Sequence, residues 1–152
     1  MKKKILHTGK YFKPFNGGIE NFLLTLMKSQ VEAGNTVKVI VHNHRIKQPS
    51  YRRVEYGAEI IRMSIFAKFL FVPFAFRAFH HILSVLKSFK PDIVHAHLPN
   101  VTCFWLLFLP QKLTGKLILH WHSDVLGENP YFFIKMLYPM YHVRPVIPTF
   151  NS

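Results

Sequence analysis

Near its start, after Met1-Lys2-Lys3-Lys4, the chain has the apolar run Ile5-Leu6-His7-Thr8, which is followed by the turn Lys13-Pro14-Phe15-Asn16-Gly17-Gly18-Ile19-Glu20. The run predicts a strand, and residues 18–33 predict a helix whose apolar side chains share one face. Backbone N–H groups at a helix start are unpaired, and the helix dipole favours a negative charge there. Because glycine lets a phosphate approach the backbone closely, Gly17 and Gly18 are candidate phosphate-binding residues. A strand-to-helix turn that binds nothing is the alternative.

Strand-like and helix-like segments alternate along the rest of the chain. Strands are predicted at 36–41, 54–63 (one or two strands, broken near Gly57), 92–97 and 116–121, and helices at 66–89 (one or two, kinked near Pro73), 101–109 and 131–141. Such alternation predicts an α/β fold, a Rossmann-like parallel sheet with helices on both faces. The expected domain covers residues 1–142, and residues 143–152 form an irregular tail.

Composition narrows the class of protein. A length of 152 residues fits one domain, and 49% hydrophobic residues argue against disorder. A net charge of +13 favours anionic partners, and a single cysteine, Cys103, excludes an intrachain disulfide. The segment 66–86 is the one candidate for a membrane span, but its basic residues and Pro73 argue against that interpretation.

Pairs of histidines lie at the ends of three of the strand-like runs: His42/His44, His95/His97 and His120/His122. The two members of a pair face the same side of a strand, and ligands of open parallel sheets bind at the carboxyl ends of strands. A histidine there can orient a hydroxyl group, act as a base or hold a metal ion. It can equally be a packed side chain that bonds to a backbone carbonyl. Because the pairs end different strands, they need not converge.

Several other functions are disfavoured by the sequence. It contains neither G-x-G-x-x-G nor G-x-x-x-x-G-K-[ST], which argues against dinucleotide oxidoreductases and P-loop enzymes. A zinc hydrolase would need converging ligands and carboxylates behind them, and only Asp124 lies near a histidine pair. The main alternative is a non-catalytic basic module that binds anionic lipid or RNA, although no aromatic RNA-binding platform is recognisable.

Three motifs in sequence order carry a resemblance to a known family. They are the glycine turn at 13–20, Lys90-Pro91-Asp92-Ile93-Val94-His95-Ala96-His97-Leu98-Pro99-Asn100, and Leu119-His120-Trp121-His122-Ser123-Asp124. Together they resemble the N-terminal half of a GT-B glycosyltransferase of the retaining family 4 type, from Lys3 to about Tyr141. The last motif is most similar to that of bacterial mannosyl- or rhamnosyltransferases of surface-polysaccharide assembly.

The resemblance implies a domain that binds the acceptor and faces the donor across an interdomain cleft. Gly17 and Gly18 would approach the donor diphosphate, His122 would be the active-site histidine, and His97 and Asp124 would help to bind substrate. The implied partners are a nucleotide sugar, a lipid-linked or saccharide acceptor and an anionic membrane surface, with no nucleic acid, no metal and no other cofactor. The implied location is cytoplasmic, peripheral on the inner face of the cytoplasmic membrane.

The sequence departs from the family pattern in one respect. The family's second domain holds the nucleotide sugar and carries two glutamates separated by seven residues. No two carboxylates of this sequence have that spacing. We therefore expect a truncated product, a frameshifted remnant or an excised domain that lacks the C-terminal donor-binding domain and is inactive alone. A separate C-terminal domain is one candidate partner, and the sequence leaves open whether a second polypeptide supplies it.

Overall fold

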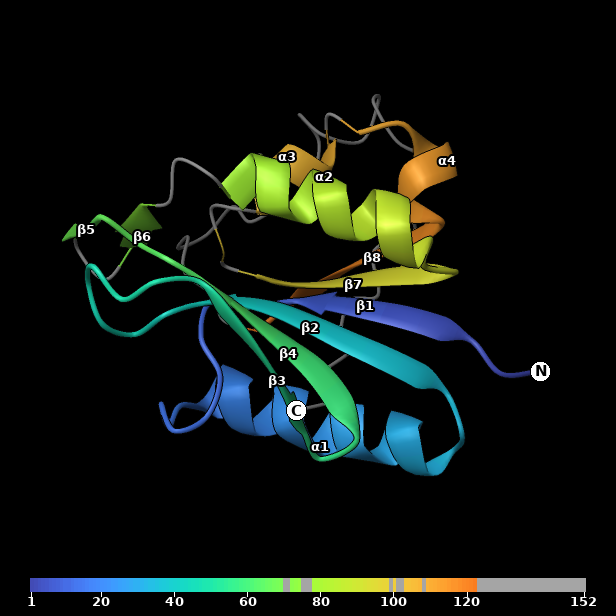
Figure 1. The fold of residues 1–152 in the computed structure, drawn as a ribbon. Coiled ribbons are helices and arrows are strands. Elements are labelled where there is room, and N and C mark those ends of the chain that lie inside the picture. Colours follow the sequence, from blue (N-terminus) through green and yellow to red (C-terminus); the bar gives the residue numbers. More distant parts are fainter. Residues whose placement is uncertain (70–71, 75–77, 99, 101–102, 108, 123–152) are drawn as a thin grey trace, which may run out of the picture.

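In a computed structural model, the chain is described over residues 1–69, 72–74, 78–98, 100, 103–107 and 109–122. Six strands form one sheet in the order β3-β4-β2-β1-β7-β8 (Figure 1). Their bounds are β1 Lys4–Thr8, β2 Thr36–His42, β3 Tyr51–Glu55, β4 Ala58–Met63, β7 Ile93–Leu98 and β8 Lys116–Trp121. All neighbouring strands are parallel except β3 and β4. The predicted α/β, Rossmann-like fold is confirmed.

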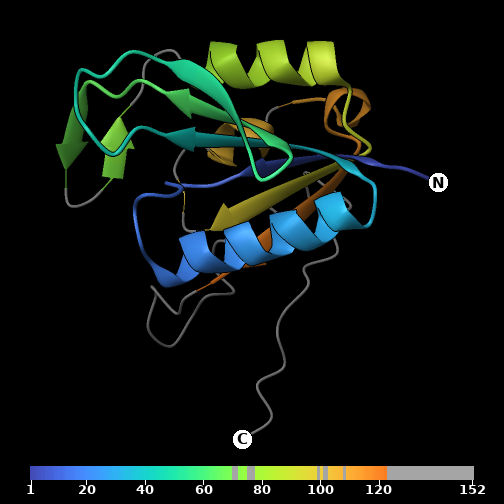
Figure 2. The ribbon, with the colours of Figure 1, turned by 60° about the horizontal axis from the view of Figure 1, so that its bottom comes forward.

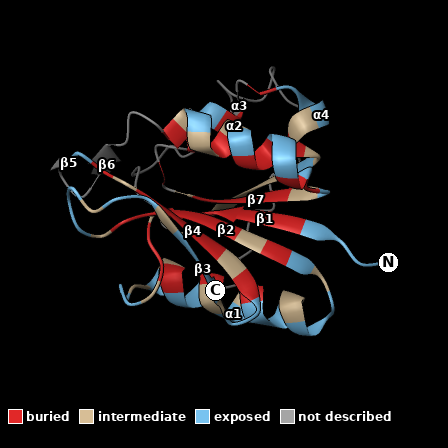
Figure 3. Cartoon of the chain, in the orientation of Figure 1, coloured by how far each residue is buried: buried red, intermediate tan, exposed pale blue. Residues whose placement is uncertain are grey.

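Helices cover both faces of the sheet. Helix α1 (Gly18–Glu32) lies on one face, and α2 (Ala78–Phe89), α3 (Phe104–Leu107) and α4 (Gln111–Thr114) lie on the other (Figures 1 and 2). Side chains alternate along each strand, so Ile5 packs into the core under α1 and Leu6 into the core under α2. Buried residues accordingly lie along the strands of the sheet and in the helices on either side of it (Figure 3).

Two tight turns use glycines with positive φ angles. Gly34 (φ 81°) follows the last turn of α1, as the sequence predicts, and the Asn35 side chain bonds to the amide of Lys3 and the carbonyl of Gln30. Gly57 (φ 78°) separates β3 from β4, and this confirms the predicted break in the strand pattern. The two strands form an antiparallel hairpin at the edge of the sheet.

The helix predicted over 66–89 is confirmed for Ala78–Phe89 and is wrong for the described residues 67–69 and 72–74. Two short strands, β5 (Ala67–Phe69) and β6 (Val72–Phe74), pair antiparallel in the first part of that segment. Pro73 explains the difference, because proline lacks an N–H group and pushes the residue before it toward an extended conformation. In a two-stranded ribbon that missing donor is tolerated at an edge.

Further along the chain, the helix predicted over 101–109 is confirmed for Phe104–Leu107 (α3), and α4 was not predicted. The predicted helix at 131–141 and the predicted tail at 143–152 lie outside the described residues. Over the described part of the chain, we find no helix with both the length and the apolarity that crossing a bilayer requires.

Candidate functional site

Five imidazoles line the face of β1, β7 and β8 that α1 covers. They belong to His7, His95, His97, His120 and His122, and neighbouring ring centroids lie 4.1–5.8 Å apart. The alternate residues of these strands, such as Leu6 and Val94, pack on the α2 side. The face under α1 is therefore apolar along β2 and β4, and rich in histidine along β1, β7 and β8.

A chain of hydrogen bonds runs through three of these rings. Nε2 of His7 lies 2.6 Å from Oε1 of Gln30, Nδ1 of His7 lies 3.0 Å from Nε2 of His97, and Nδ1 of His97 lies 2.8 Å from Nε2 of His122. An amide oxygen only accepts, so Nε2 of His7 carries the proton. The same logic then places a proton on Nε2 of His97 and on Nε2 of His122. Gln30 on α1 thus fixes the tautomer of His122 and leaves Nδ1 of that ring with a lone pair.

The environment keeps these imidazoles neutral. Burial lowers the pKa of both His7 and His122 to about 4, and that of His95 to about 3. The pKa values of His97 and His120 are also lowered, chiefly by burial and, for His97, by the neighbouring imidazoles. A neutral imidazole has one donor and one acceptor nitrogen. At neutral pH the site therefore offers hydrogen-bonding groups without a positive charge on the rings.

Helix α1 brings its first turns to the same site. The ring of Phe22 contacts His120 and His122 edge-on, with centroids 4.8 and 5.0 Å apart. Phe22 lies four residues after Gly18, the first residue of the helix. His97, His122 and the amino-terminal part of α1 are thus on one face of the sheet, near the carboxyl ends of β7 and β8.

The two glycines at the start of α1 have different surroundings. Gly17 has an extended backbone (φ −157°), and a Cβ atom there would collide with the carboxylate of Glu20, which is buried. A Cβ atom at Gly18 would meet open space. Neither backbone geometry nor crowding by neighbours therefore requires glycine at position 18.

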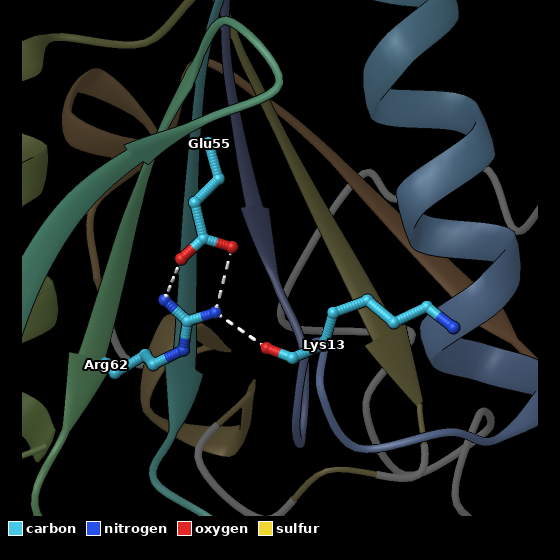
Figure 4. A network of polar contacts seen from close by, with 3 residues as sticks. All are labelled: Lys13, Glu55 and Arg62. Atoms are coloured by element: carbon cyan, nitrogen blue, oxygen red, sulfur yellow. Dashed lines mark hydrogen bonds and ion pairs between the residues drawn. The ribbon is translucent and has the colours of Figure 1, made fainter.

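A buried arginine holds the loop that leads to these glycines. The guanidinium of Arg62 on β4 donates to both carboxylate oxygens of Glu55, at 2.6 and 3.2 Å, and to the carbonyl oxygen of Lys13, at 2.7 Å (Figure 4). Its side chain is 5% exposed, and Cζ of the guanidinium lies 5.8 Å from the ring centroid of Phe12 and 5.4 Å from that of Tyr51. Arg62 therefore ties the loop to the β3–β4 hairpin, a role that the sequence analysis missed.

The structure brings together only part of what the histidine pattern suggests. The pairs on β7 and β8 converge, whereas His42 belongs elsewhere: its Nδ1 bonds to the carbonyl of Lys10, and its strand position matches Ile40 in the core under α2. His7 joins the cluster instead. It was missed because it is a single histidine, and only the pairing of β1 with β7 places it beside His95. Asp124 lies outside the described residues.

Comparison with known proteins shows which family the chain belongs to. The family profile for Glycosyltransferase Family 4 matches residues 16–145, which include the start of α1, both converging histidine pairs and Asp124. The chain belongs to glycosyltransferase family 4. It is also similar to the sulfoquinovosyl transferase SQD2 of Arabidopsis thaliana, with 25% identity over 134 residues. That match covers 88% of this chain and 25% of the plant protein, so the chain spans about a quarter of its relative's length.

Proposed function

We propose that this family 4 chain forms the acceptor-side half of a retaining glycosyltransferase that uses a nucleotide sugar. The observation that carries the proposal is the meeting of His97 and His122 with the amino-terminal part of α1, through Phe22, on one face of the sheet. The unfilled space beside Gly18 supports it, because a ligand phosphate can approach the backbone there.

In this reaction the chain supplies electrostatic stabilisation and positioning. The N–H groups and the dipole at the start of α1 stabilise the negative charge that develops on the leaving diphosphate. The lone pair on Nδ1 of His122 accepts a hydrogen bond from a hydroxyl group of the reacting sugar. His97 lines the acceptor side, and Asp124 is a further substrate-binding residue. Holding both substrates in this geometry contributes to the rate.

The donor sugar is held by a second domain, on another polypeptide or another part of a longer protein. The absence of the paired glutamates from this sequence supports this division. The acceptor is lipid-linked or a growing saccharide of surface-polysaccharide assembly, and the net charge of +13 holds the protein at the anionic inner face of the cytoplasmic membrane. We expect no sugar transfer when the purified chain is mixed with nucleotide sugars and a lipid-linked acceptor. Turnover by the chain alone would contradict this division.

Replacing Gly18 tests the phosphate-binding part of the proposal. We expect Gly18→Ala to fold with unchanged or slightly higher stability, by up to about 1 kcal/mol, because alanine favours a helix and its methyl group meets open space. The same methyl group occupies the approach path of a phosphate. The affinity for inorganic pyrophosphate, measured by calorimetry at low salt, should therefore fall at least tenfold, or about 1.4 kcal/mol.

The matched control is Ser29→Ala, an exposed position near the other end of α1. It should leave pyrophosphate affinity unchanged. If Gly18→Ala bound pyrophosphate as well as the unaltered chain, and only added salt weakened binding, the basic surface would be the site. That result would favour a general anion-binding module over the glycosyltransferase site.

A further inference from the structure

We propose that His97, His120 and His122 bind a divalent transition-metal ion. The three residues offer ring nitrogens that all lie within 4.8 Å of one another. His97 comes from β7, while His120 and His122 are alternate residues at the end of β8. Three imidazoles with an open fourth position form a known ligand set for zinc. This inference goes beyond the proposed transfer reaction, in which no step uses an ion.

A second trio, His7, His95 and His97, also has its ring nitrogens close together, but it is buried. His120 and His122 are partly exposed, so an ion can reach them from solvent. The two residues that only the second trio contains, His7 and His95, are 0% and 9% exposed. These differences favour the trio at the strand ends as the metal site.

The separation of one pair of ring nitrogens is already close to that in a zinc site. Nδ1 of His97 and Nε2 of His122 lie 2.8 Å apart. Two nitrogens bound to tetrahedral zinc at 2.0–2.1 Å are separated by about 3.3 Å. The rings of His120 and His122 stack with centroids 4.1 Å apart and planes inclined by 13°, so these rings must turn out of the stack before their nitrogens can share one ion. That rotation, with roughly half an ångström more between the nitrogens of His97 and His122, creates room for the ion.

The hydrogen bonds behind the trio match those that support metal-binding histidines. Such histidines almost always donate their second ring N–H to an acceptor that fixes the tautomer. Here Nε2–H of His97 donates to His7, which in turn donates to Gln30. Nδ1 of His97 is thereby held as a lone pair directed at His122. An ion takes the place of the proton between these two rings, and His122 then carries its proton on Nδ1. In the metal-bound chain this atom donates a hydrogen bond, so the acceptor role proposed for sugar transfer belongs to the metal-free chain.

The chemistry of the ligands determines which ion fits. Imidazole suits zinc, copper and nickel, whereas magnesium and calcium prefer oxygen ligands. The trio supplies only imidazole nitrogens. We therefore expect binding of Zn²⁺ or Ni²⁺ and none of Mg²⁺ at the same concentration.

Zinc titration of the full chain tests the proposal. The chain, without an affinity tag, is stripped of metal with EDTA, dialysed and titrated with Zn²⁺ in a calorimeter. We expect one ion per chain, and at least tenfold weaker binding for His120→Gln and for His122→Gln. His80→Gln, which replaces an exposed histidine on α2, serves as the matched control and should leave affinity and stoichiometry unchanged.

Two further measurements keep the test decisive if a variant folds poorly. The visible spectrum of the Co²⁺-loaded, unaltered chain should show tetrahedral coordination by nitrogen. Gln30→Leu removes the hydrogen bond between Gln30 and His7, which supports His97 from behind. This variant should weaken zinc binding roughly tenfold. The proposal would be overturned if the unaltered chain did not bind zinc saturably. A Co²⁺ spectrum typical of octahedral coordination by oxygen alone would also overturn it. Because no sugar or pyrophosphate is present, these results stand apart from those for the proposed function.

Discussion

The folded chain is expected to lose much of its stability between pH 6.5 and pH 4. His7 and His42 are both buried, and burial lowers the pKa of each to about 4 from the ordinary value of 6.5. Between these pH values the unfolded chain binds more protons than the folded chain, so stability falls as the pH falls. The titration of His7 alone should lower the free energy of unfolding by about 2 kcal/mol at pH 5 and by about 3 kcal/mol once the pH is below 4.

Urea unfolding followed by circular dichroism, at several pH values and with EDTA present, measures this loss. The free energy of unfolding should decrease steeply below pH 6.5, toward zero for a domain of ordinary stability. His80→Gln should show the same pH dependence, because His80 is exposed. His42→Gln should show a shallower one, because one buried imidazole no longer titrates. Equal stability at pH 7 and pH 5 would contradict the burial of these imidazoles.

The second large effect is expected for Arg62→Met. The substitution leaves the carboxylate of Glu55 and the carbonyl of Lys13 without the guanidinium that both contact. Removing one partner of a buried ion pair costs about 3–5 kcal/mol, and Glu55, at 20% exposure, keeps some contact with water. We therefore expect a loss of about 3 kcal/mol in the free energy of unfolding, measured with urea at pH 7.5.

Arg52→Met is the matched control on the same hairpin. Arg52 lies 3.5 Å from Glu59 but is 56% exposed, so its loss should cost less than 1 kcal/mol. Adding Glu55→Leu to Arg62→Met should restore part of the stability, because the carboxylate left without its partner is then gone. If the two arginine variants were equally stable, Arg62 would not hold the loop as the contacts indicate.

The sequence predicted those parts of the fold that depend on local pattern. The run Ile5-Leu6-His7-Thr8, the apolar face of residues 18–33 and the break near Gly57 all have local physical causes, and all are present in the structure. The helix prediction for the segment around Pro73 was wrong, because the phenylalanines of this segment fit a helical face as well as a strand. Pro73 lacks the N–H group that a helix interior requires, and the segment instead forms the strand pair β5–β6.

The candidate site was only half predictable, because it depends on which strands are neighbours. A spacing of two residues correctly places His95 with His97 and His120 with His122 on one face. Nothing local shows that β7 and β8 are adjacent, that β1 brings His7 to the same cluster, or that β2 turns His42 to the opposite face. The roles of Gln30 and Arg62 are likewise contacts between residues far apart in sequence.

The most direct test of a shared site at the start of α1 and the ends of β7 and β8 is heteronuclear NMR. An isotope-labelled chain is titrated with inorganic pyrophosphate while the amide of Gly18 and the ring nitrogens of His122 are followed. Both should shift together and saturate at the same concentration, with Nδ1 of His122 unprotonated at neutral pH. Saturable shifts confined to the basic terminus at Lys2–Lys4, with Gly18 and His122 unmoved, would contradict the site.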